Sequence, residues 1–136
     1  MKKVYISGRI SDMEKDQYMT LFRIAEEMLN KDGFNAVNPT RFWLCRIYRM
    51  MEKVIGKETA YRVTLLYDVV KLLRCDLIYK IPGWQQSRGA NIESCVAYHF
   101  KVWPMRKDIA KKIDKRLEKM IKKFESSKPS TTNDAK

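Results

Sequence analysis

Short apolar runs alternate with longer segments in which apolar residues recur at helical spacing. The short runs are rich in β-branched and aromatic residues, which is typical of buried strands, whereas recurrence every three to four residues indicates a helix. We predict strands over residues 2–7, 34–37, 76–81 and 102–105. We predict helices over residues 13–31, 41–56, 58–74, 90–100 and 106–124. Asp12 is the expected N-cap of the first helix, because an aspartate accepts hydrogen bonds from the free N–H groups there.

The first strand, the first helix and the second strand form a β-α-β unit, and strands and helices continue to alternate afterwards. Alternation of this kind predicts an α/β fold with a parallel sheet. Ligands of such sheets bind beside the carboxyl ends of the strands. The candidate ligand-binding segments are therefore residues 7–12, 38–40 and 82–93, which follow the first three strands.

The third of these segments offers the most to a ligand. Gly83 and Gly89 allow the backbone to approach a bound molecule closely, and Ser87 and Arg88 precede a helix whose free N–H groups attract anions. The Walker motif GxxxxGK[ST] and the motif GxGxxG are both absent from the sequence. We therefore predict a loop, the cradle, that binds a phosphate or a sugar and that is neither a Walker loop nor a dinucleotide-binding glycine loop.

Four further side chains carry candidate chemistry, each with a plain structural alternative. Glu93 lies in the opening turns of a helix, where the macrodipole favours an ionised carboxylate suited to nucleophilic attack, or where an acid simply stabilises the helix end. Asp68 borders an apolar helix face, which implies either a raised pKa and proton donation or a surface ion pair. Tyr5 could orient a carboxylate or serve only in the core. Trp84 could stack on a nucleobase or anchor its own loop.

Composition predicts one soluble domain. The 136 residues are 45% apolar and 32% charged, so we expect a single domain over residues 1–125 and a disordered polar tail over 126–136. No apolar run is long enough for a membrane span or a secretion signal. Three cysteines without a CxxC pair and a single histidine, His99, predict reduced cysteines in the core, a structural histidine, no metal and a cytoplasmic protein. We expect no cofactor.

Positive charge is concentrated near the end of the chain. The net charge is +12, of which +5 falls in residues 1–100 and +7 in residues 101–136. A block of this kind either binds phosphates or forms the solvated face of a surface helix. Most of the excess charge therefore lies outside the candidate ligand-binding segments.

Three segments taken together resemble a known family. They are residues 4–10 (VYISGRI), Asp68 with Cys75-Asp76, and residues 82–93 (PGWQQSRGANIE). Over residues 2–105 the chain resembles small bacterial and phage proteins of unassigned function, which are related to nucleoside 2-deoxyribosyltransferases and deoxynucleoside-monophosphate N-glycosidases. The basic helix predicted near the end of the chain lies outside the resemblance.

The resemblance implies a flavodoxin-like (Rossmann-like) three-layer sandwich with four or five parallel strands. It implies cleavage or transfer of the N-glycosidic bond of a (deoxy)nucleoside or its 5′-monophosphate through a covalent glutamyl-sugar intermediate. Glu93 matches the nucleophile, Asp68 the acid that protonates the departing base, and Tyr5 the hydroxyl that positions the nucleophile. Ser87 matches a serine that contacts the 5′-phosphate.

The other expected substrate-binding residues lie after the first strand and in the cradle. They are Ser7, Gly8, Arg9, Ile10, Gly83, Trp84, Arg88 and Gly89. Ser11 stands where the monophosphate hydrolases have an arginine, and Arg9 is a nearby substitute. Relatives complete their sites across a dimer interface, so the resemblance also implies a homodimer.

Two other functions remain open. The chain could be a nucleotide-binding module that acts as a sensor without turnover. It could also be a nucleic-acid-associated protein that uses its lysine-rich last helix. Release of a free base identifies the enzyme, and salt-dependent binding of a polynucleotide identifies the third function.

Overall fold

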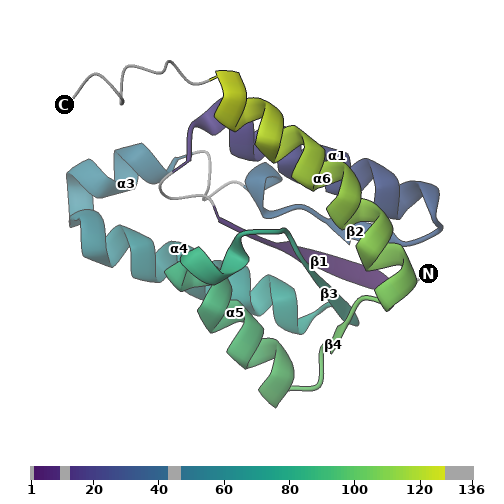
Figure 1. Ribbon diagram of the computed structural model, residues 1–136. Helices are drawn as coiled ribbons and strands as arrows, with labels where there is room; N and C mark the ends of the chain where they lie inside the picture. Colours follow the sequence, from purple (N-terminus) through teal and green to yellow (C-terminus); the bar gives the residue numbers. More distant parts are fainter. Residues whose placement is uncertain (1, 10–12, 43–46, 128–136) are drawn as a thin grey trace.

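Four parallel strands form the sheet at the centre of the computed structural model (Figure 1). The structure describes residues 2–9, 13–42 and 47–127. The strands are β1 (Lys3–Ser7), β2 (Asn35–Val37), β3 (Leu77–Lys80) and β4 (Trp103–Pro104), in the order β2-β1-β3-β4. Val4 pairs with Ala36 on one side and with Leu77 on the other, so β1 lies inside the sheet. The predicted parallel sheet is confirmed, and its fourth strand has only two residues.

Five α-helices of the described residues flank the sheet. They are α1 (Lys15–Lys31), α3 (Tyr48–Ile55), α4 (Lys57–Leu73), α5 (Arg88–His99) and α6 (Lys107–Ser127), with the short 3₁₀ helices η1 (Pro39–Arg41) and η2 (Trp84–Gln86). Figure 1 shows α1 and α6 over one face of the sheet, α4 and α5 over the other, and α3 extending from α4. Three layers and this strand order make the flavodoxin-like fold that was predicted, with the basic helix α6 at its end.

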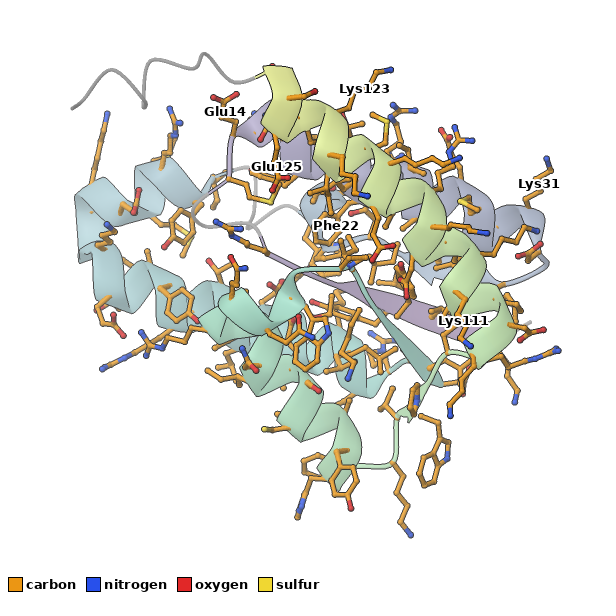
Figure 2. All side chains as sticks on the ribbon, viewed as in Figure 1. Glu14, Phe22, Lys31, Lys111, Lys123 and Glu125 are labelled. Atoms are coloured by element: carbon orange, nitrogen blue, oxygen red, sulfur yellow. The ribbon has the colours of Figure 1, made fainter. Side chains whose placement is uncertain are left out.

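Side chains of β1 alternate between two apolar cores. Val4 and Ile6 pack with Phe22 of α1 and with Leu117 of α6, in the core between these helices and the sheet (Figure 2). Tyr5 points to the opposite face, into a smaller core that α4 and α5 cover. The strand therefore aims its polar positions at the α4–α5 layer.

Several predicted boundaries need correction. Of the helix predicted over 41–56, residues 43–46 lie outside the described residues and Tyr48–Ile55 form α3; Arg41 belongs instead to η1, which Asn38 caps by accepting a hydrogen bond from the N–H of Thr40. The N-cap of α1 is Glu14, which makes no side-chain capping bond, and Asp12 lies outside the described residues. At the other end of the chain, α6 continues through residue 127, beyond the predicted start of the tail at residue 126.

The predicted apolar face of α4 is mostly not buried. Leu72 is fully buried, but Leu66 is 65% exposed and Leu73 is also exposed. Exposed apolar side chains extend along both α3 and α4: Met50, Val54, Ile55, Val63, Leu66, Val70 and Leu73. Periodicity correctly marked an apolar stripe, and no described part of the chain covers it.

Candidate active site

The carboxylate of Glu93 is held at the carboxyl end of β1 by two hydroxyl groups. Glu93 is the sixth residue of α5 and only 5% exposed. The Tyr5 hydroxyl donates to Oε2 at 2.6 Å, and the Ser7 hydroxyl donates to Oε1 at 2.7 Å. Because Tyr5 and Ser7 are two positions apart on one strand, they project from the same face of the sheet. Both carboxylate oxygens are therefore fixed in orientation.

Burial raises the pKa of Glu93 to about 7, while the hydrogen bonds from Tyr5 and Ser7 act in the opposite direction. The position of Glu93 in the opening turns of α5 was expected to favour the ionised carboxylate. Loss of solvation at this buried position acts against that form and outweighs the groups that favour the anion. Glu93 therefore titrates close to neutral pH.

Asp68 is half-buried on α4, on the same side of the sheet as Glu93. Burial, and then the charge of Glu93, raise the pKa of Asp68 to about 8. None of the ion pairs between described residues includes Asp68, so the raised pKa is the interpretation that the structure favours. Burial and the charges of Glu93 and Asp68 also raise the pKa of Tyr5 well above 10. The three predicted catalytic groups thus share one electrostatic cluster.

The start of α5 carries the predicted cradle. Ser87 is the N-cap, and its hydroxyl oxygen accepts from the N–H of Ala90 at 3.2 Å while its own proton remains for donation. Gly83 has φ +94°, a conformation that favours glycine. Arg88 is exposed and lies 3.4 Å from a carboxylate oxygen of Glu58. These residues gather near the helix N-terminus, as predicted.

Sequence reasoning missed Lys80, the last residue of β3. Lys80 lies beside Ser7 in the strand register, and its Nζ donates to the Ser94 hydroxyl at 3.2 Å. The same Nζ lies 4.3 Å from the centroid of the Trp84 ring, an arrangement that anchors the η2 loop through a cation–π contact. A signal was available, since a charged residue that ends a central strand lies where parallel sheets bind ligands.

Two hydroxyl groups on α4 were also missed. The Tyr61 Oη and Thr64 Oγ1 atoms are buried and have no hydrogen-bond partner among the described residues. Together with Asp68 they recur every three to four residues, so they share one side of the helix. A side-chain atom added at Gly89 would lie 3.4 Å from Tyr61 Oη, which places this hydroxyl against the start of α5. Unpartnered buried hydroxyls are unfavourable unless a ligand supplies the hydrogen bond.

The loop after β1 packs closely at its first glycine. A Cβ at Gly8 would lie 3.1 Å from Ile81 and 3.2 Å from Phe22, so a larger residue would require these side chains to shift. Arg9 follows it and is half-buried. Ile10 lies outside the described residues.

The remaining candidates do not join the cluster around Glu93. His99 is exposed and its ring packs edge-on against Phe100. Cys75 is buried as predicted, whereas Cys95 is exposed, so the prediction of a core position was wrong for Cys95; Cys45 lies outside the described residues. Within the described ranges, no three His, Cys, Asp or Glu side chains lie together as a metal site would require. No helix of the described ranges has the length and apolar composition needed to cross a membrane.

The arrangement combines two carboxyl groups in different environments. Glu93 accepts hydrogen bonds from two hydroxyl groups and has a pKa of about 7. Asp68 has a pKa of about 8 and so keeps its proton to a higher pH. Enzymes that break glycosidic bonds generally use two carboxyl groups in different environments.

Comparison with known proteins identifies a family. No curated protein and no solved structure matches this chain. A family model matches three-quarters of the chain at residues 2–103, which include the strands up to Trp103 and the residues of the Glu93 cluster. The chain therefore belongs to the family described as Domain of unknown function (DUF4406).

Proposed function

We propose that the protein cleaves or transfers the N-glycosidic bond of a (deoxy)nucleoside or its 5′-monophosphate. The observation that carries the proposal is the placement of the Glu93 carboxylate between the Tyr5 and Ser7 hydroxyls, beside an Asp68 whose pKa is higher. Glycoside cleavage needs one ionised and one protonated carboxyl group near the same bond. The cluster supplies both close to neutral pH.

In the first step, a Glu93 oxygen forms a bond to C1′ of the sugar as the bond from C1′ to the base nitrogen breaks. The electron pair of that bond passes to the base, and Asp68 donates its proton to the base. In the second step, water or a second base attacks C1′ and releases the Glu93 carboxylate, while Asp68 recovers a proton from the attacking group. Water makes the reaction a hydrolysis and a base makes it a transfer; neither requires a cofactor.

The surrounding groups fit a nucleotide in this position. Ser87 and the free N–H groups at the start of α5 suit the 5′-phosphate, and Lys80 adds a positive charge at the end of β3. The unpartnered hydroxyls of Tyr61 and Thr64 could bind polar atoms of the sugar or phosphate. Trp84, in cation–π contact with Lys80, lies just after the carboxyl end of β3.

Chromatographic detection of free base tests the proposal. Deoxynucleosides and their 5′-monophosphates are incubated with the wild type, with Glu93→Gln, and with the control Glu118→Gln, which changes an exposed glutamate on α6. We expect base release by the wild type and the control and none by Glu93→Gln. Full turnover by Glu93→Gln would contradict the covalent mechanism. Nucleotide binding without base release would favour the sensor function instead.

We also propose that a second copy of the chain covers the exposed apolar side chains of α3 and α4. Charged residues of both signs border this surface, including Arg49, Glu52, Lys53 and Glu58. A mixed surface of this kind can pair with itself around a two-fold axis. Because α4 also carries Asp68, such a dimer would hold in place the helix that carries this residue of the proposed active site.

The spacing of the cysteines supports a cytoplasmic location for the activity.

A further inference from the structure

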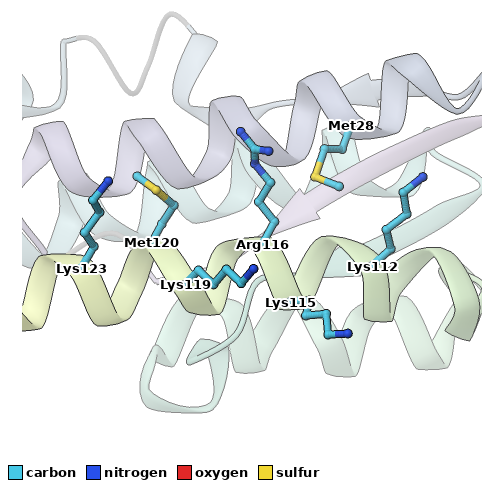
Figure 3. Close-up of a pocket in the computed structure, with 7 residues that line it drawn as sticks. All are labelled: Met28, Lys112, Lys115, Arg116, Lys119, Met120 and Lys123. Carbon is cyan, nitrogen blue, oxygen red and sulfur yellow. The ribbon is translucent and has the colours of Figure 1, made fainter.

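A groove between α1 and α6 is lined by positive charge (Figure 3). Five cationic side chains of α6 line it: Lys112, Lys115, Arg116, Lys119 and Lys123. Met28 of α1 and Met120 of α6 complete the lining. In Figure 3, Lys112, Arg116 and Lys123 extend from α6 toward α1, with the two methionines between the helices. No acidic residue lines the groove among the residues that the structure describes.

Three acidic residues of α6 line a second hollow. They are Asp108, Asp114 and Glu118, and Lys112 and Lys115 border both this hollow and the groove. Asp114 also accepts a 2.5 Å hydrogen bond from Tyr79. The groove cations have one acidic neighbour within salt-bridge distance among the described residues, Asp32, whose carboxylate is 3.8 Å from Lys112 Nζ. The cations that line the groove therefore form a positive flank of α6, and these three acidic residues lie outside it.

The positive flank is also linear. Residues 112, 116, 119 and 123 recur every three to four positions, so they form one stripe along the helix. At about 1.5 Å per residue the stripe is about 16 Å long, which is about five base-pair steps of a nucleic-acid duplex. A single small anion would contact only part of such a stripe.

Other polyanionic partners fit less well. The apolar side of α6 packs into the core, where Ile113 and Leu117 are fully buried. The helix therefore has no apolar face to insert into a membrane. Among the residues that the structure describes, no aromatic side chain lines the groove on which an unpaired base could stack. Contacts through phosphates alone remain, and these are independent of sequence.

We propose that the groove between α1 and α6 binds the phosphodiester backbone of a nucleic acid without sequence selection. The groove lies on the face of the sheet opposite to Glu93, since α1 and α6 cover one face and α4 and α5 the other (Figure 1). Nucleic-acid binding is therefore physically separate from the proposed glycosidic site, and either function can fail without the other.

The test is binding of a fluorescently labelled DNA duplex of mixed sequence, followed by anisotropy between about 50 and 200 mM salt. The variant replaces Lys112, Arg116, Lys119 and Lys123 with glutamine. Each phosphate contact contributes about −0.9 to the slope of log K against log salt, so loss of four contacts should flatten the slope by about three to four. We expect affinity at the lowest salt to fall at least tenfold.

A matched control removes the same total charge elsewhere. It replaces Lys2, Lys3, Lys101 and Lys107 with glutamine; all four are exposed, line neither the groove nor the apolar surface of α3 and α4, and lie near the start of β1, after α5 and at the start of α6. We expect this control to keep the wild-type slope, and thermal unfolding should show that both variants are folded, because every replaced side chain is exposed.

Three results would overturn the proposal. The first is absence of duplex binding by the wild type at about 50 mM salt. The second is an equal loss of slope in the groove variant and the control, which would assign binding to net charge alone. The third is displacement of the duplex by polyglutamate as effectively as by unlabelled DNA at equal charge, which would indicate an acidic protein as the partner.

Discussion

The phenol of Tyr5 donates a 2.6 Å hydrogen bond to Glu93, a residue 88 positions away in the sequence. The contact exists because β1 is an inner strand and α5 packs across the face to which Tyr5 points. Burial and the neighbouring negative charges keep the pKa of Tyr5 well above 10, so its hydroxyl stays protonated at neutral pH. Tyr5 therefore acts as a permanent donor that favours the ionised form of Glu93.

Replacement of Tyr5 by phenylalanine should raise the pKa of Glu93. The lost hydrogen bond to a charged acceptor contributes about 1.5–3 kcal/mol, which corresponds to about one to two pKa units. A ¹³C NMR titration of the glutamate carboxyl carbons measures this change directly. If base release depends on ionised Glu93, its pH profile should move upward by the same amount.

Tyr79→Phe is the matched control for this experiment. Tyr79 is also buried, but its hydroxyl donates to Asp114 on the α6 side of the sheet. We expect the Glu93 titration to be unchanged in Tyr79→Phe. An equal shift in both variants would mean that general loosening of the fold, and not the Tyr5 contact, sets the pKa of Glu93.

The buried carboxyls should make the protein less stable as the pH rises. Their pKa values in the folded state are about 7 for Glu93 and about 8 for Asp68, against ordinary values of 4.5 and 3.8. The folded state therefore binds more protons than the unfolded state between about pH 4 and 8, and the free energy of unfolding falls across this range.

Glu93→Gln removes one of these titrations while keeping the shape of the side chain. At about 1.4 kcal/mol per pKa unit, we expect the variant to gain a few kcal/mol over the wild type at about pH 8 and little at about pH 4. Urea unfolding at both pH values measures the difference. A gain that is the same at both pH values would show that titration of Glu93 is not its source.

The sheet was predictable because each strand can be recognised from its own short stretch of sequence. The apolar run around Val4-Tyr5-Ile6 needs burial on both faces, and parallel pairing follows from the helices between successive strands. The short helix η1 was not predictable in this way, since it depends on the hydrogen bond that the Asn38 side chain accepts from Thr40. Periodicity also identifies the apolar stripe of α4 without revealing what covers Leu66.

Some residues of the candidate site, such as Glu93 and Asp68, could be picked out from the sequence, but their electrostatics could not. Helix position alone implies that Glu93 is stabilised as an anion. Its pKa is raised because burial removes solvent from the carboxylate, against the hydrogen bonds from Tyr5 and Ser7, and this burial depends on contacts across more than 80 positions of sequence. Lys80 and Ser94 likewise meet only in three dimensions.

Ser87→Asp should change substrate preference while keeping the fold. An aspartate also caps a helix well, so the N-cap contact to Ala90 is kept, but its charge repels a 5′-phosphate. We expect kcat/KM for the monophosphate to fall at least tenfold relative to that for the nucleoside. Comparison of the two substrates in a base-release assay measures the ratio. An unchanged ratio would show that Ser87 does not contact the phosphate.

Leu66→Lys should convert the proposed dimer to a monomer. Leu66 is 65% exposed in the single chain, so a lysine at this position is hydrated and leaves the stability of the monomer unchanged. When a second copy covers the position, the lysine charge is buried, which disfavours association. Light scattering after size exclusion should report twice 16.2 kDa for the wild type and 16.2 kDa for the variant.

The control is Tyr98→Lys. Tyr98 belongs to α5, outside the apolar surface of α3 and α4, and its side chain is even more exposed than that of Leu66, so the control variant should remain dimeric. A wild type of 16.2 kDa, or a variant of unchanged mass, would contradict a dimer through this surface and leave the exposed stripe of α4 to a different protein.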